Sequence, residues 1–131
     1  MKKFTILKLV GLAILAMIIL VLISFGEVAV YSYLINPGQD EAVYEAHANA
    51  TAPYVSGIFG FILFFLAARN WKKKGNPDAF RLAILFPTVY LLLDVIIITA
   101  AAVNWSDFIL IFALANAAKF LGSYTGYAFT R

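Results

Sequence analysis

Four long apolar runs occupy most of this sequence, and they constrain its fold more than any other feature. The chain has 131 residues, of which 63% are hydrophobic and only 13% are charged. A globular domain in water is usually about 45–50% apolar and about 25% charged, because much of a small domain's surface must face solvent. We therefore expect the runs to cross a lipid bilayer as helices of about 20 or more residues each.

Proline, glycine and asparagine mark the boundaries between the apolar runs. They predict four membrane helices, at about residues 4–34, 53–70, 78–103 and 107–129. A short polar segment at about residues 40–49 is predicted to form a small helix outside the membrane, capped by Asp40. Because the connections are short, consecutive helices should be antiparallel neighbours in an all-α four-helix bundle. Residues 1–131 would then form a single membrane domain.

The first apolar run has a second interpretation. It follows a basic start and ends near a small-x-small site at Ser24-Phe25-Gly26, as a cleaved signal peptide does. We favour an uncleaved membrane helix, because the apolar core is long for a signal peptide and the chain stays hydrophobic beyond the site.

The positions of lysine and arginine predict how the helices are threaded. Basic residues gather at the N-terminus, in the second connection and at the C-terminus: Lys2, Lys3, Lys8, Arg69, Lys72, Lys73, Lys74, Arg81 and Arg131. The other two connections contain none. Cytoplasmic segments of membrane proteins carry the excess of basic residues, so we expect a cell-membrane protein with both termini in the cytoplasm. The orientation of the helices in the membrane explains why the second connection is basic, so we expect no nucleic-acid partner. We expect the chain to be surrounded by the lipid bilayer.

An acid and an amine stand inside the last two apolar runs, where an unpaired charge costs roughly 2.5–3.5 kcal/mol on insertion scales. With a rise of about 1.5 Å per residue, Asp94 in the third helix and Asn116 in the fourth reach similar depths. Lys119 and Ser123 share a helical face with Asn116, and Tyr90 lies one turn from Asp94. These five residues predict an intramembrane polar cluster.

Three arrangements of this cluster are open. Asp94 can form an ion pair with Lys119, supported by Asn116 and Tyr90. Alternatively, Asp94 is protonated, because loss of hydration disfavours its charge. In the third arrangement Lys119 extends toward the inner headgroups, and Asp94 is solvated in a cavity. The cluster would serve either to fix the register of two helices or as a proton- or ion-responsive site.

Small residues in the second and fourth runs permit close helix packing. They are Ser56, Gly57, Gly60, Gly122 and Gly126. These faces favour a structural or accessory membrane protein that packs with a protein partner or with a second copy of itself. The alternative is an ion- or proton-coupled transporter or channel protomer that uses Asp94, Asn116 and Lys119.

The sequence lacks the residues that several classes of chemistry require. It has no cysteine, which excludes disulfides and thiol catalysis. Glu41 and Glu45 share a helical face, but His47 points away from them, so we expect no metal site. No HExxH or GxSxG motif is present, and we expect neither an enzyme nor a cofactor. Glu27 is expected to be hydrated near the outer end of the first helix.

Overall fold

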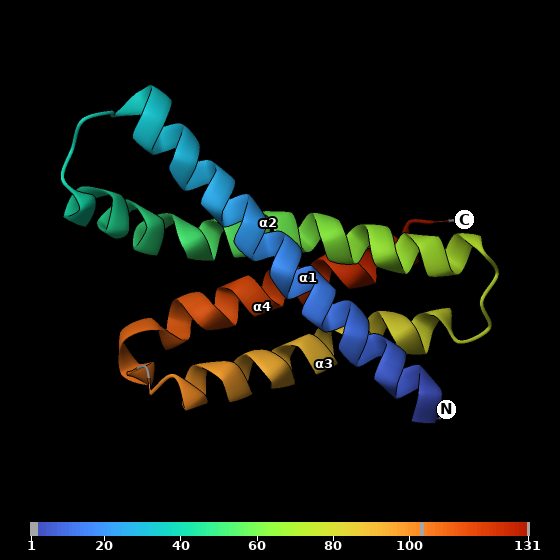
Figure 1. Cartoon of the computed structure of the whole chain (residues 1–131). Coiled ribbons are helices and arrows are strands. Elements are labelled where there is room, and N and C mark those ends of the chain that lie inside the picture. The colour runs from blue at the N-terminus through green and yellow to red at the C-terminus, as the bar shows by residue number, and fades with distance from the viewer. Residues whose placement is uncertain (1–2, 103, 131) are drawn as a thin grey trace.

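Four long helices and one π-helical turn make up the part of the chain that the structure describes (Figure 1). The computed structural model describes residues 3–102 and 104–130. Its elements, in chain order, are α1 (Lys3–Val30), the π-helical turn η1 (Tyr31–Ile35), α2 (Glu41–Lys73), α3 (Ala79–Ala100) and α4 (Trp105–Ala128). No strand occurs among these residues, and all four helices are long and apolar enough to cross a membrane. The predicted all-α class with four long apolar helices is confirmed.

The second helix is longer than predicted. We expected a small helix at residues 40–49 and a separate membrane helix at 53–70, but α2 runs through Pro53 without interruption. That division is wrong because Pro53 removes only one helical hydrogen bond, the one that its own nitrogen would donate to the carbonyl of Asn49. The alanine-rich segment before it favours helix and carries the element back to Glu41.

The ends of the other helices follow local hydrogen bonds. Gly75 has a φ of 69°, and its N–H bonds to the carbonyl of Lys72 while Asn76 bonds to Trp71, which terminates α2. The Asn104 side chain accepts a hydrogen bond from the Ser106 N–H at 3.2 Å, so α4 begins at Trp105, two residues earlier than predicted. The third helix ends at Ala100, and its predicted end at Val103 lies outside the described residues.

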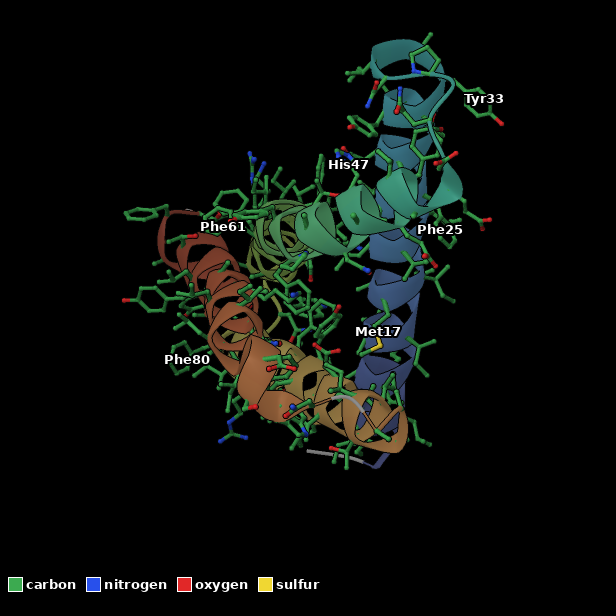
Figure 2. All side chains as sticks on the ribbon, turned by 90° about the vertical axis from the view of Figure 1, so that its left-hand side faces the viewer. Met17, Phe25, Tyr33, His47, Phe61 and Phe80 are labelled. Atoms are coloured by element: carbon green, nitrogen blue, oxygen red, sulfur yellow. The ribbon has the colours of Figure 1, made fainter. Side chains whose placement is uncertain are left out.

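α1 crosses α2 and α3 diagonally and packs on them through one stripe of its surface (Figure 1). The stripe has helical spacing and consists of Leu9, Ala13, Ala16 and Leu20, all buried. It meets an aromatic cluster in which Phe64 of α2 stacks on Phe86 of α3, with ring centroids 4.4 Å apart. Figure 2 shows Met17 on the side of α1 that faces the other helices, whereas Phe61 and Phe80 lie on the far side of the molecule.

α2 and α4 approach each other more closely than any other two helices. A Cβ atom added to Gly122 would lie 2.9 Å from the Cα atom of Phe61, and one added to Gly126 would lie 2.9 Å from the Cα atom of Phe65. Gly57 lies against the backbone of Ala115. The small-residue faces of α2 and α4 therefore pack against each other within the chain. Residue numbers in these pairs rise together, so the two helices run in the same direction.

We predict that Gly122→Ala destabilises the protein by about 1–3 kcal/mol, because the added methyl group meets backbone that cannot move aside without separating α2 from α4. Gly11→Ala in α1 is the matched control, since nothing lies within 4 Å of the added Cβ. It should be neutral or stabilising, as alanine favours helix over glycine. Thermal unfolding in detergent followed by circular dichroism measures both. Equal effects of the two substitutions would contradict the close contact.

Candidate functional site

Lys119 is a charged side chain buried where α2, α3 and α4 meet, with 1% of its surface exposed. Its ammonium donates hydrogen bonds to Ser56 Oγ at 2.8 Å and to the Ala115 carbonyl at 3.4 Å. The same ammonium lies 4.9 Å from the centroid of the Tyr90 ring. Hydrogen bonds to a charged group and contact with an aromatic face both offset loss of hydration. Neutral groups from three helices thus hold this cation.

Gly60 provides the space for the Lys119 stem. A Cβ atom added to Gly60 would lie 2.9 Å from Lys119 Cε and 3.0 Å from Cγ. Ser56 lies one turn earlier on the same face of α2 and receives the ammonium. Ser56 and Gly60 therefore form a notch in α2 that fits both parts of the lysine side chain. We predicted these two residues only as helix-packing positions.

Asp94 does not form the predicted ion pair with Lys119. The one ion pair within the described part of the chain joins Glu27 and His47, and Lys119 instead bonds to Ser56. The Asp94 carboxylate accepts a long hydrogen bond of 3.4 Å from Asn116 Nδ2. The first of the three arrangements, an ion pair between these side chains, is therefore wrong, and the amine bonds to Ser56 instead. Lys119 does not extend to the end of the helix either, since its ammonium is held inside the bundle.

Two cavities meet at Asp94, and both are also lined by Ala52 and Ser56. The first, of about 400 Å³, extends to α1 and includes Tyr90. The second, of about 590 Å³, extends to the start of α4 and includes Asp107 and Asn116. Asp94 therefore lies in a cavity, as the third arrangement of the cluster supposed. This placement gives its carboxylate access to ligands other than protein groups.

Ser123 takes part in a different contact from the one predicted. Its hydroxyl donates a hydrogen bond to the carbonyl of Ala83 on α3. Pro87 has no N–H, so the carbonyl four residues earlier, that of Ala83, lacks its helical donor. Ser123 and Pro87 are both fully buried, which makes an unpaired carbonyl costly there. Ser123 thus satisfies the acceptor that the proline leaves open, and it joins α4 to α3.

Glu27 and His47 form a contact that sequence reasoning missed. His47 Nε2 lies 2.6 Å from one Glu27 carboxylate oxygen, and Thr51 Oγ1 donates to the other at 3.0 Å. The His47 ring stacks on Tyr31, with centroids 3.6 Å apart. We had expected Glu27 to be hydrated. No local spacing signals this contact, because it depends on how the chain turns back from α1 to α2. It fixes the C-terminal end of α1.

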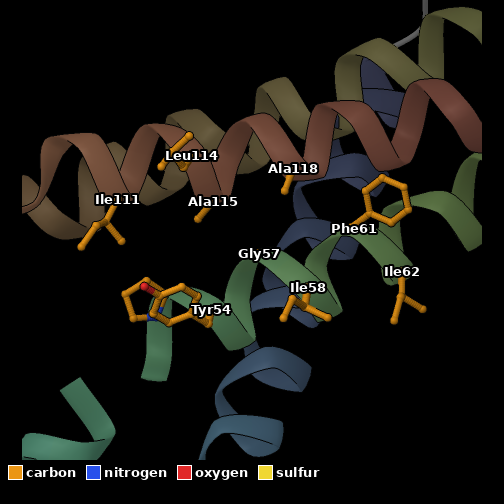
Figure 3. Close-up of a pocket in the computed structure, with 10 residues that line it drawn as sticks. Tyr54, Gly57, Ile58, Phe61, Ile62, Ile111, Leu114, Ala115 and Ala118 are labelled. Atoms are coloured by element: carbon orange, nitrogen blue, oxygen red, sulfur yellow. The ribbon is translucent and has the colours of Figure 1, made fainter. Parts of the chain in front are cut away.

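An apolar groove follows α2 and α4 on the outer side of the bundle (Figure 3). It has a volume of about 480 Å³, and Tyr54, Ile58 and Leu114 at its edges are exposed. No charged side chain lines it. The groove therefore offers mainly apolar contact, whereas the polar side chains between α2, α3 and α4 lie around Asp94 and Lys119.

Comparisons with protein-family models, with curated proteins and with solved structures found no match for this chain.

The pairing of Ser123 with the carbonyl freed by Pro87 can be tested by a double-mutant cycle. We predict that Ser123→Ala costs about 1–2 kcal/mol of unfolding free energy in wild-type background, because a buried carbonyl loses its donor. In a Pro87→Ala background the restored backbone N–H supplies that donor, and the cost should fall to about half or less. Chemical unfolding in detergent gives both values. The same cost in both backgrounds would contradict the pairing.

Proposed function

We propose that this chain is a multi-pass membrane protein and that the region around Asp94 and Lys119 is an ion- or proton-coupled transport site. Its four long helices would span the bilayer, with consecutive helices antiparallel. Large apolar side chains exposed on all four helices support insertion, because water would hydrate them unfavourably. Examples are Leu7, Leu22, Ile58, Leu66, Leu92, Ile96, Leu110 and Leu114.

The arrangement of chain ends and connections supports a cytoplasmic location for both termini. In Figure 1 the start of α1, the end of α4 and the connection between α2 and α3 lie at one end of the molecule, and the other two connections lie at the opposite end. The first of these ends carries Lys72, Lys73 and Lys74. Lys2 and Arg131, which belong to the same basic pattern, lie outside the described residues. The positive-inside rule then favours the cytoplasm for this end.

Cysteine labelling tests this orientation, because the natural chain has no cysteine. We predict that Gln39→Cys reacts with a membrane-impermeant maleimide on intact cells, since residue 39 is exposed in the connection between α1 and α2. Lys74→Cys, exposed in the connection between α2 and α3, should react only after permeabilisation. The reverse pattern would place the termini outside.

Use of the small-residue faces inside the chain favours transport over an accessory role. An accessory protein would present such faces to its partner, but Gly57, Gly122 and Gly126 pack within the α2–α4 interface. The observation that carries the transport proposal is the carboxylate of Asp94 in a cavity, with the buried ammonium of Lys119 bound to Ser56 on the wall of that cavity. Ionisable groups inside a membrane domain commonly mark ion pathways.

The geometry also suggests how cavity occupancy affects the helices. A cation or proton that reaches Asp94 cancels the negative charge nearest to Lys119, so the ammonium loses electrostatic stabilisation in a medium of low dielectric constant. The buried ammonium, which joins α4 to α2 through Ser56, would then favour a helix arrangement in which it is better solvated. Occupancy of the cavity would thereby shift the balance between two arrangements of these helices, as coupled transport requires.

We predict that purified protein in liposomes carries a cation- or proton-dependent flux that Asp94→Asn abolishes and Lys119→Met uncouples. A pH-sensitive dye inside the vesicles, with and without an imposed potential, measures proton flux; radiolabelled or ion-selective assays measure other cations. Glu45→Gln is the matched control, because Glu45 is an exposed acid on α2 outside the cavity. If Asp94→Asn with Lys119→Met keeps both the fold and the flux of wild type, the transport proposal fails.

A further inference from the structure

The larger cavity beside Asp94 is lined by acceptors and carboxylates. The partly exposed Asp94 on α3 is one of its lining residues, and the exposed Asp107 lies in the first turn of α4. Asn49, Asn104 and Ser56 add further polar groups. No lysine, arginine or histidine lines it, and the buried ammonium of Lys119 is bound to Ser56, one of the lining residues. The charge of the lining is therefore negative and would attract a cation.

Asn116 leaves an acceptor without a donor beside this cavity. Its side chain is 4% exposed, and the Oδ1 atom is buried with no hydrogen-bond partner. The Nδ2 atom is already used, since it donates to the Phe112 carbonyl at 3.1 Å and to Asp94 at 3.4 Å. A buried amide oxygen with no partner costs about 1–3 kcal/mol. Asn116 lines the cavity, so a rotation of its amide would bring this oxygen to a ligand that donates hydrogen bonds and would remove this cost.

The backbone of α2 contributes a second acceptor of this kind. Pro53 and Asn49 both line the cavity. Because Pro53 has no N–H, the Asn49 carbonyl lacks its helical donor. The long bond from Asn116 is the only hydrogen bond that the described residues make to the Asp94 carboxylate. The Asn116 oxygen on α4 and the Asn49 carbonyl on α2 are thus two acceptors without a donor, and both residues line the cavity.

We propose that this cavity binds a small primary organic ammonium ion, and, resting on the proposed function, that this ion is the cargo. An ammonium group has three N–H donors and a positive charge, which match the Asp94 carboxylate and the Asn116 oxygen. The remaining walls, formed by Ala52, Ile111 and Phe112, are apolar and would contact a hydrocarbon part. A volume of about 590 Å³ is within the usual range of small-molecule sites.

A bare metal ion fits the cavity less well. A metal site needs several ligands that converge on one point. Among the described residues no group of three or more histidine, cysteine, aspartate or glutamate side chains is placed to hold one. Asp94 and Asp107 come from different helices and line a space far larger than an ion. The separation of charged and apolar walls suits an amphipathic cation instead.

Calorimetric titration of the purified full chain in detergent tests the proposal with matched probes. The probes are 2-phenylethylammonium chloride, neutral 2-phenylethanol, anionic 3-phenylpropanoate and sodium chloride. We expect binding of 2-phenylethylammonium and at least about tenfold weaker binding of the neutral and anionic compounds. Asp94→Asn and Asn116→Leu should each weaken ammonium binding by about tenfold, as loss of one charge-assisted hydrogen bond does.

Two further variants keep the test decisive if Asp94→Asn does not fold. Asp107→Asn alters an exposed residue at the start of α4 and should weaken ammonium binding about threefold, with unchanged circular dichroism. Glu45→Gln should leave binding unchanged. The proposal is overturned if the neutral or anionic probe binds as well as the ammonium, if sodium alone binds, or if Asp107→Asn and Asn116→Leu both bind like wild type.

Failure of this inference is distinguishable from failure of the proposed function. A protein that conducts protons through Asp94 in liposomes but binds no ammonium probe retains the transport proposal and loses the cargo. A protein that binds 2-phenylethylammonium through Asp94 and Asn116 but carries no flux has the binding site proposed here and does not transport.

Discussion

The close approach of α2 and α4 determines where the charges of this protein can lie. Gly122 and Gly126 allow α4 to rest on the α2 backbone, and Gly60 then makes room for the Lys119 stem. At this separation the ammonium lies 2.8 Å from Ser56 Oγ and donates a hydrogen bond to it. A buried cation needs hydrogen-bond partners with good geometry, and a wider gap would leave it unpaired. The packing of the small residues therefore determines where the charge of Lys119 lies.

Each of the two prolines within helices frees a backbone carbonyl near polar residues. Pro87 frees the Ala83 carbonyl, which Ser123 satisfies from α4. Pro53 frees the Asn49 carbonyl beside the cavity of Asp94. Buried backbone groups without helical partners need another hydrogen-bond partner or access to a polar cavity. Both irregular positions meet that condition, one by a side-chain donor and the other by the cavity.

The sequence predicted the helices better than their contacts. Apolar runs, and the glycine and asparagine residues between them, predicted four long helices, because these signals are local. The expected break before Pro53 failed, since one missing hydrogen bond does not outweigh the helical bonds on both sides. Shared depth brought Asp94 and Asn116 together correctly. Depth alone did not reveal that Lys119 would bond to Ser56, on a third helix, and not to Asp94. The contact of Glu27 with His47 likewise depends on the turn between α1 and α2, which no periodicity encodes.

A disulfide between α2 and α4 tests the close approach most directly. A Cβ atom at residue 57 lies 4.0 Å from Ala118 Cβ, within the range of about 3.5–4.5 Å that disulfides require. Because the chain has no cysteine of its own, Gly57→Cys with Ala118→Cys places a single reactive pair in it. Mild oxidation should cross-link this pair within one chain, seen as a reductant-sensitive shift of the monomer band on denaturing gels. A protein that stays uncross-linked, or that cross-links only into dimers, would contradict the internal packing of α2 on α4.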